Sequence, residues 1–297
     1  MSLVTNIDAI VAPELAVVPG SVSARLGALR TRMPARALSP AGEERLRALV
    51  RAAAPAREGT GFHPIDSGNP GASYAEACIP VADGAPVRAR LIMPRAYESP
   101  SSAGERAHRD GAGVPLVLAF HDAGRPVRGW HHLARFAALG CAVLALDAGT
   151  VPPGDAVDAL PALAAPALAT AQAGFGLPGV DAARACTWGE GLGGALALIV
   201  AAAWPERIGA CAVQNPFPLD DPALPDHVDA ACLVTRLRCR LLVGTALMDE
   251  LAPAEAQAAL ANGAAGSCRA RQIFYSKFAH ERINDFEDEV LRFLCFE

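Results

Sequence analysis

The sequence predicts an α/β protein with a doubly wound, mainly parallel β-sheet and helices on both faces. Two observations carry this prediction. From about residue 114 onward, short apolar runs alternate with Ala- and Leu-rich helical segments, and segments that alternate in this way build parallel sheets with helical crossovers. Several runs, such as Val114–Phe120, are apolar almost throughout, which is typical of strands buried on both faces. A chain of 297 residues is long enough to bury one large core.

The expected elements divide the chain into two parts. Residues 1–60 are rich in Ala, Arg and Pro and lack strand patterning. We expect them to form an N-terminal arm with one helix that begins after Ser39, packed on the core or on a neighbouring subunit. Residues 61–297 are expected to form a single α/β domain. That domain would begin with two strands, 74–81 and 86–93, joined by a short turn.

A surface loop is expected over the Ser-, Gly- and charge-rich residues 97–113. The type of each later element follows from the spacing of its apolar residues. The elements expected after the loop are strand 114–120, helix 130–139, strand 141–146, helix 155–174, strand 185–188, helix 193–203, strands 209–213 and 240–243, helix 253–262, strand 271–275 and helix 284–295.

Composition and charge exclude several classes of protein. Hydrophobic residues make up 52% of the chain, which excludes a disordered or collagen-like protein. The formal net charge of −5 gives no general attraction to nucleic acid or to an anionic membrane, so neither is expected as a partner. The N-terminus has no basic segment before an apolar core, and no apolar stretch reaches the ~20 residues of a membrane span. We therefore expect a cytoplasmic protein.

The eight cysteines contain no C-x-x-C pair, and several stand inside apolar runs. A buried thiol behaves as a small hydrophobic group, so we expect reduced core cysteines rather than disulfides or metal ligands. No set of His, Cys, Asp or Glu residues has the spacing of a metal site. The sequence predicts neither a metal nor another cofactor.

A glycine-rich turn lies where strand 185–188 must lead into helix 193–203. Its residues, 189–194, read G-E-G-L-G-G. A strained strand-to-helix turn that presents a nucleophilic serine has the pattern G-x-S-x-G, because its backbones come close together. The frame here runs from Gly189 to Gly193, and its central residue is Gly191. A phosphate-binding loop is the alternative, but the rest of that pattern is absent and the turn comes too late for a first βα unit.

An acid and a histidine follow two later strands. Asp249 comes shortly after strand 240–243, and His280 shortly after strand 271–275. In open α/β sheets the carboxyl ends of the strands carry the site, so these side chains are expected near Gly191. An aspartate that orients a histidine can make it a working base. The alternative is a histidine that is simply hydrogen-bonded, as a structural remnant.

These runs resemble the acetyl xylan esterase and cephalosporin C deacetylase family of carbohydrate esterases, whose segments read G-G-S-Q-G-G-A-L-A, G-L-M-D-x-x-x-P and Y-x-x-F-G-H-E. The corresponding residues are 189–197, 246–253 and 275–281. Residues 120–124, F-H-D-A-G, match the family's oxyanion segment, F-H-G-Y-G. The resemblance covers about residues 74–297 and implies the α/β-hydrolase fold. Its order of nucleophile, acid and histidine is that of α/β-hydrolase triads.

The departures from the family lie in the site itself. The serine is replaced by Gly191, the glutamine after it by Leu192 and the glycine before it by Glu190. The family's D-x-R-G reads Asp147-Ala-Gly-Thr here, so that arginine is lost, and the segment 215–235 is shorter than the family's helical insertion. No seryl acyl-enzyme is available to this chain.

Three other residues near the turn have expected roles. The backbone N–H groups of Leu192 and Ala123 would form an oxyanion hole, and His121 would lie beneath it as a structural histidine. Glu190 has two interpretations. It is a carboxylate nucleophile or acid beside the histidine if the turn shifts by one residue, or it pairs with a cation or solvent.

The sequence favours an enzyme that uses His280, Asp249 and the oxyanion hole without an acyl-enzyme, as a lyase, an isomerase or a water-mediated hydrolase. Its partner would be a small molecule with an ester or carbonyl group. One alternative is a weak or engineered acetyl esterase, against which the joint loss of Ser, Gln and Arg argues. Another is a non-catalytic relative that binds a small molecule or a protein. The arm and the resemblance favour a homo-oligomer.

Overall fold

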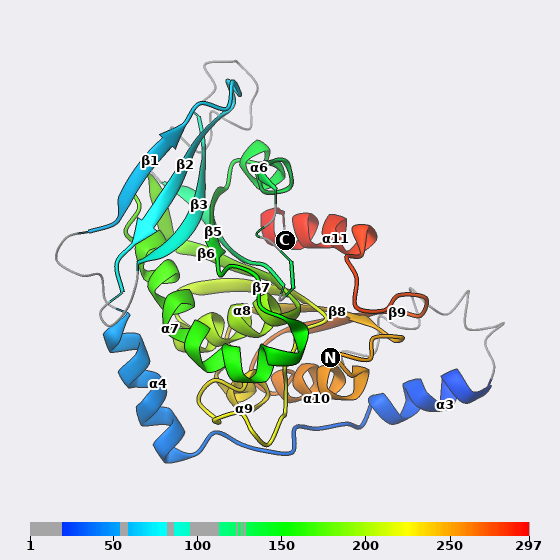
Figure 1. The fold of residues 1–297 in the computed structure, drawn as a ribbon. Coiled ribbons are helices and arrows are strands. Elements are labelled where there is room, and N and C mark those ends of the chain that lie inside the picture. The colour runs from blue at the N-terminus through cyan, green and yellow to red at the C-terminus, as the bar shows by residue number, and fades with distance from the viewer. Residues whose placement is uncertain are drawn as a thin grey trace.

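The computed structural model describes residues 20–53, 59–81, 86–95, 113–122, 124, 125, 127 and 129–296. They form a nine-stranded sheet in the order β1-β2-β3-β5-β4-β6-β7-β8-β9 (Figure 1). In this order, the neighbours from β5 through β4, β6, β7 and β8 to β9 pair in parallel. At the other end of the sheet, β1 pairs antiparallel with β2, β2 with β3 and β3 with β5. The strands are β1 Gly61–Ile65, β2 Ala72–Ile79, β3 Val87–Pro94, β4 Val114–Phe120, β5 Ala142–Asp147, β6 Val180–Glu190, β7 Ile208–Gln214, β8 Arg240–Ala246 and β9 Ala270–Tyr275.

Helices cover both faces of the sheet (Figure 1). Alternate residues of β4 enter two separate cores: Leu116 and Leu118 pack with α7, α8 and α10 on one face, and Val117 and Ala119 pack with α6 and α11 on the other. This confirms the predicted doubly wound α/β fold. The helices are α3 Gly20–Leu29, α4 Pro40–Ala52, α6 Trp130–Ala138, α7 Ala156–Phe175, α8 Gly191–Ala203, α9 Ala230–Leu233, α10 Ala254–Ala264 and α11 Asn284–Cys295, with short 3₁₀ turns η1 Pro153–Asp155 and η2 Val234–Arg236.

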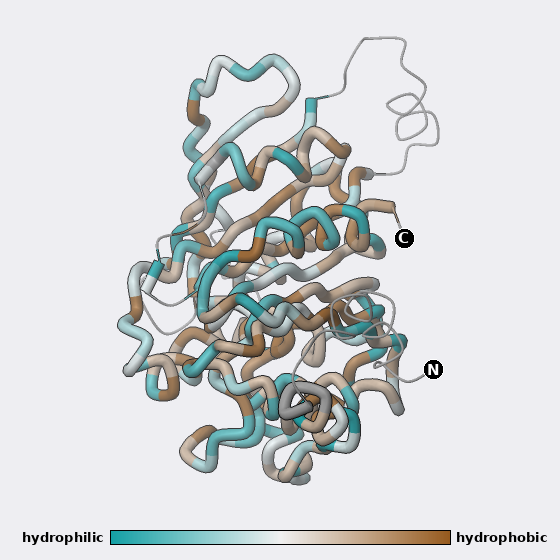
Figure 2. The backbone as a smooth tube through the Cα atoms, turned by 90° about the vertical axis from the view of Figure 1, so that its right-hand side faces the viewer, coloured by the Kyte–Doolittle hydropathy of each residue, from teal (hydrophilic) through white to brown (hydrophobic). Residues whose placement is uncertain are grey.

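The pattern that holds α11 in place is visible in its sequence. Phe286, Val290 and Phe293 recur at helical spacing and are buried, while the residues between them are mostly charged. Figure 2 shows the resulting alternation of hydrophilic and hydrophobic colour along the segment that leads to the C-terminus. This amphipathic face seals the side of the sheet opposite α7 and α8.

Two strands differ from the sequence prediction. The strand expected at 185–188 begins earlier, at Val180. Residues 181–184 are partly buried or exposed and include no large apolar side chain, so the sequence gives no signal of a strand there. β1 was not expected, since it is an edge strand with four exposed residues and pairs only with β2. Apolar patterning cannot identify a strand that buries almost nothing. The turn at 83–84 and nearly all of the loop at 97–113 lie outside the described residues.

The described part of the N-terminal arm packs against its own domain. Leu26, Leu29 and Leu46 are buried in the core on the α7 and α8 side. The helix α4 begins where predicted, and its N-cap Ser39 accepts a hydrogen bond from Gly42 N–H at 3.0 Å. Whether residues 1–60 also contribute to an oligomer stays a prediction.

Along the described parts of the chain, no helix has the length and apolar character needed to cross a membrane. All eight cysteines are free thiols.

The ion pair between the half-buried Arg36 and the buried Asp229 fixes the segment between α3 and α4. Asp229 is fully buried, and besides Arg36 it accepts hydrogen bonds from the N–H groups of Asp220 and Ala231. We expect Arg36→Ala to lower the free energy of unfolding by ~2–3 kcal/mol, because it leaves a buried carboxylate without its cation. Urea unfolding measures this loss.

The matched control is Arg51→Ala. Arg51 pairs with Glu44 at the surface, with side chains 64% and 62% exposed, so its removal should lower the free energy of unfolding by less than ~1 kcal/mol. Equal losses for the two variants would contradict the assigned role of Arg36.

Candidate active site

The site lies at the carboxyl edge of the parallel strands, where the ends of four of them meet. Asp122 follows β4, Gly191 opens α8 directly after β6, Asp249 follows β8 and His280 follows β9. Open α/β sheets bind ligands at this edge. The sequence placed three of these four residues here.

The turn from β6 into α8 has the geometry of the predicted elbow. Gly191 adopts a left-handed conformation with φ +50°, which glycine takes at no steric cost. A Cβ atom on Gly189 would lie 2.1 Å from the carbonyl oxygen of Gly193, and one on Gly193 would lie 2.3 Å from the carbonyl oxygen of Phe120. The close approach of these backbones explains why glycines stand on both sides of residue 191.

The carboxylate of Asp122 fills the space beside Gly191. A Cβ atom on Gly191 would lie 1.7 Å from Oδ1 and 2.4 Å from Cγ of Asp122. The N–H of Leu192 donates a hydrogen bond to the same Oδ1 at 3.2 Å, and the carboxylate is almost fully buried. Asp122 therefore stands where the side chain of a serine at position 191 would stand.

Asp122 was missed as a site residue in the sequence. It appears there only as the third residue of the run 120–124, where the related family has glycine. The sequence did contain one signal. Relative to the segments of the family that it resembles, this chain has Asp122 at a glycine position and Gly191 at the serine position.

His280 lies between two carboxylates. Its Nδ1 is 2.7 Å from Oδ2 of Asp249, and its Nε2 is 3.1 Å from Oδ2 of Asp122. The other oxygen of Asp249 accepts hydrogen bonds from the N–H groups of Leu251 and Ala252, each at 2.9 Å. The structure thus brings together the predicted Asp249 and His280, and extends their chain of hydrogen bonds to Asp122.

The charge state of His280 follows from these contacts. Burial alone would lower its pKa, but the hydrogen bonds to Asp122 and Asp249 outweigh burial and raise the pKa of His280 to about 9. At neutral pH the ring is therefore an imidazolium that donates from both nitrogens. A second cation, Arg125, donates from Nη2 to the His280 carbonyl oxygen at 3.0 Å, and its Nε lies 3.7 Å from Asp122 Oδ2.

Two polar side chains at the end of β7 brace the loop that carries His280. Gln214 donates to the carbonyl oxygen of Glu281 at 2.7 Å and accepts from the N–H of Ile283 at 3.1 Å. Asn215, which has a left-handed φ of +45°, accepts from the N–H of Ala246 at 2.8 Å. These bonds tie the β9 loop to the ends of β7 and β8, and so fix the ring of His280.

The remaining predicted site residues are placed as follows. His121 is buried. Its Nδ1 lies 2.9 Å from the carbonyl oxygen of Asp122, and its Nε2 accepts from the N–H of Ala148 at 3.1 Å, so the ring supports the backbone beneath the site. Glu190 is buried and forms an ion pair with Arg282, with Nε and Oε2 3.1 Å apart. Ala123 lies outside the described residues.

A hollow of about 160 Å³ opens beside these groups. The lining residues are Asp122, Arg125, Glu190, Gly191, Gln214, Asn215, His280 and Glu281. Within the described ranges, no group of three His, Cys, Asp or Glu side chains is placed to hold a metal ion.

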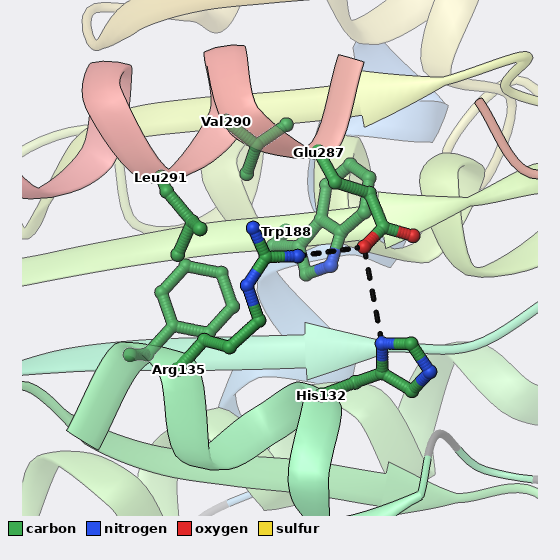
Figure 3. Close-up of a pocket in the computed structure, with 7 residues that line it drawn as sticks. His132, Arg135, Trp188, Glu287, Val290 and Leu291 are labelled. Atoms are coloured by element: carbon green, nitrogen blue, oxygen red, sulfur yellow. Dashed lines mark hydrogen bonds and ion pairs between the residues drawn. The ribbon is translucent and has the colours of Figure 1, made fainter. Parts of the chain in front are cut away.

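A second hollow, of about 250 Å³, lies between α6 and α11 (Figure 3). Arg135 donates to Glu287 there at 3.1 Å, and His132 Nδ1 lies 3.9 Å from the same carboxylate oxygen. Trp188 and apolar side chains of both helices complete its wall. Arg135 of α6 and Glu287 of α11 pair with each other across this hollow, so we interpret it as part of the packing between the two helices.

Comparison with known proteins gives matches in structure only. No protein-family model and no curated protein matches the sequence. The fold matches acetyl xylan esterase 1 from Thermoanaerobacterium sp. JW/SL YS485 with a TM-score of 0.73 and 18% identity, over 94% of this chain and 98% of that one. It matches an acetyl xylan esterase from Paenibacillus sp. R4 with a TM-score of 0.68 and 18% identity, over 93% and 99% of the two chains.

An S-formylglutathione hydrolase from Agrobacterium tumefaciens also matches, with a TM-score of 0.53 and 15% identity over 78% of this chain and 98% of that one. At such identities the likeness establishes the architecture alone. Together with the elbow and the order of the strands, it shows that this chain has the α/β-hydrolase fold.

Proposed function

We propose that this chain is an enzyme that acts on a small ester or carbonyl compound without a serine nucleophile, and that Asp122 takes the place of the serine hydroxyl. One observation carries the proposal. The row Asp122–His280–Asp249, with contacts of 3.1 and 2.7 Å, has the connectivity of a Ser–His–Asp triad with a carboxylate at its reactive end.

The roles in this row follow from its protonation. His280 carries a proton at neutral pH because its pKa is raised to about 9, so it acts as a general acid. The base is the Asp122 carboxylate, and Asp249 orients the ring. In water-mediated hydrolysis, Asp122 takes a proton from water as the water oxygen attacks the carbonyl carbon, and His280 gives its proton to the leaving oxygen. In a lyase or isomerase, the same base removes a proton from carbon.

The predicted oxyanion hole changes its composition under this proposal. The N–H of Leu192 already donates to Asp122 and is not free for a substrate oxygen. Arg125 lines the hollow beside the carboxylate, and its guanidinium supplies positive charge for a developing oxyanion. The named activities of the structural neighbours, which include two acetyl xylan esterases, support ester substrates with a short acyl group.

A second candidate is a non-catalytic protein with a hydrolase scaffold. The observation that favours it is that the charges of the site satisfy one another. The cations His280 and Arg125 face the carboxylates of Asp122 and Asp249, and Glu190 faces Arg282. Such a closed set of ion pairs is also what a purely structural network requires. Activity measurements on Asp122 variants separate the two candidates.

Asp122→Asn keeps the shape of the side chain but removes its basicity. We expect this change to lower kcat/KM at least ~100-fold, the usual contribution of a positioned base. The assay measures hydrolysis across a panel of p-nitrophenyl acetate, acetylated sugars and small lactones. Glu255→Gln, an exposed exchange on α10, is the matched control and should retain activity. An Asp122→Asn enzyme as active as the unmodified chain would refute the role of Asp122, and an unmodified chain inert on the whole panel would favour the non-catalytic candidate.

The pKa of His280 also predicts how stability changes with pH. The folded protein holds this proton more tightly than the unfolded chain, in which a histidine has a pKa of about 6.5. The stabilisation is complete below that pH and is lost as the pH rises through about 9. We expect this group to lower the free energy of unfolding by roughly 2 kcal/mol between pH 6 and 8, a range below the pH at which the cysteine thiols, whose pKa values burial raises, ionise in the unfolded chain.

Urea unfolding at several pH values measures this fall. His280→Gln should abolish it, whereas His131→Gln, at an exposed position on α6, should retain it. The same decline with pH in the His280→Gln protein would show that the stabilising proton is not on His280.

A further inference from the structure

We propose that this site is a serine-esterase site closed from within by one pair of residues, Asp122 and Gly191. The joint exchange of Asp122→Gly and Gly191→Ser would then give the chain a short-chain acyl esterase activity that neither exchange gives alone. The inference goes beyond the proposed function. It concerns what the framework can do once the carboxylate is removed, and it holds whether or not the native site turns over a substrate.

Steric exclusion is the first argument. The three heavy atoms nearest to a Cβ on Gly191 all belong to the carboxyl group of Asp122, at 1.7, 2.4 and 3.1 Å. A side chain at position 191 and the carboxylate in its observed position therefore cannot coexist, and the carboxylate would have to leave its contacts with Leu192 and His280. Because no other heavy atom outside the turn itself lies closer than 3.1 Å, removal of the carboxyl group takes away the contact that excludes a Cβ atom at position 191.

The backbone of the turn is the second argument. Gly191 retains the left-handed conformation of a nucleophile elbow. Its carbonyl oxygen accepts a hydrogen bond from Phe217 N–H at 3.0 Å, and the close approach of Gly189 to Gly193 is kept. The strand-to-helix turn that presents a serine hydroxyl is thus still built, although the hydroxyl is absent.

The rest of the machinery is the third argument. Asp249 is 2.7 Å from Nδ1 of His280, as a triad acid must be. Without the Asp122 carboxylate, the N–H of Leu192 is free to donate to an oxyanion. His280 then faces one carboxylate instead of two, which lowers its pKa toward the range of a base at neutral pH.

The chemistry of the exchanged protein balances with an ester and water alone. The introduced hydroxyl attacks the acyl carbon and its proton passes to Nε2 of His280, which delivers it to the departing alcohol. Water then attacks the acyl-serine with His280 as the base, and the carboxylic acid leaves as the serine hydroxyl is regenerated.

The experiment compares four full-length proteins: the native chain, Asp122→Gly, Gly191→Ser and the double variant. We expect the double variant to hydrolyse p-nitrophenyl acetate at least ~100-fold faster than Asp122→Gly, and to be the one protein of the four that a fluorophosphonate labels at position 191. His280→Ala added to the double variant should remove the hydrolysis. A second version, Asp122→Ala with Gly191→Ser, repeats the test with less disturbance of the backbone at position 122.

Thermal unfolding supplies an independent readout. Gly191→Ser should lower the Tm by several degrees in the native chain, because the new side chain meets the carboxylate, and by clearly less in the Asp122→Ala background, where the carboxylate is absent. Double variants that fold but neither label nor hydrolyse would overturn the proposal, as would an equal loss of Tm from Gly191→Ser in the native chain and in the Asp122→Ala background. Neither result bears on the role of native Asp122, which the Asp122→Asn assay tests separately.

Discussion

The hydrogen bond between Asp122 and His280 is the contact around which the site is organised. Two carboxylates from the ends of β4 and β8 hold one imidazolium from the end of β9, and each of the three groups is buried or nearly so. A buried carboxylate persists only with a partner for its charge. If the ring lost its proton, Asp122 and Asp249 would both lose the positive charge that they face. The charged ring therefore stabilises the buried carboxylate of Asp122, and that carboxylate in turn stabilises the charged ring.

This arrangement also explains the glycine at the elbow. The carboxylate of Asp122 occupies the volume that a Cβ at position 191 would need, and it takes the N–H of Leu192 that would serve a substrate oxygen. Under our proposal, a single side chain therefore fills the position of the nucleophile, makes its hydrogen bond to histidine and occupies one oxyanion donor. Gly191 and Asp122 are compatible with each other, because glycine leaves room for the carboxylate.

The sequence foretold the parts of this structure that depend on local patterning. The strands β4, β5 and β7 are buried on both faces, so each is recognisable in the sequence as an apolar run. The order of residues along the chain is enough to place Asp249 and His280 after neighbouring strands. The edge strand β1 and the polar first half of β6 bury too little to be recognised. Asp122 escaped notice because its partners, Leu192 and His280, are 70 and 158 residues away along the chain, and their proximity exists only in the fold.

The protonation of His280 is the property on which this account depends most directly, and NMR titration of its ring nitrogens in ¹⁵N-histidine-labelled protein measures it. We predict a titration midpoint near 9 for the native chain, with a lower midpoint in Asp122→Asn, because one of the two carboxylates that stabilise the imidazolium is gone. A native midpoint at or below the ordinary histidine value of about 6.5, or one that Asp122→Asn leaves unchanged, would contradict the placement of the Asp122 carboxylate on His280.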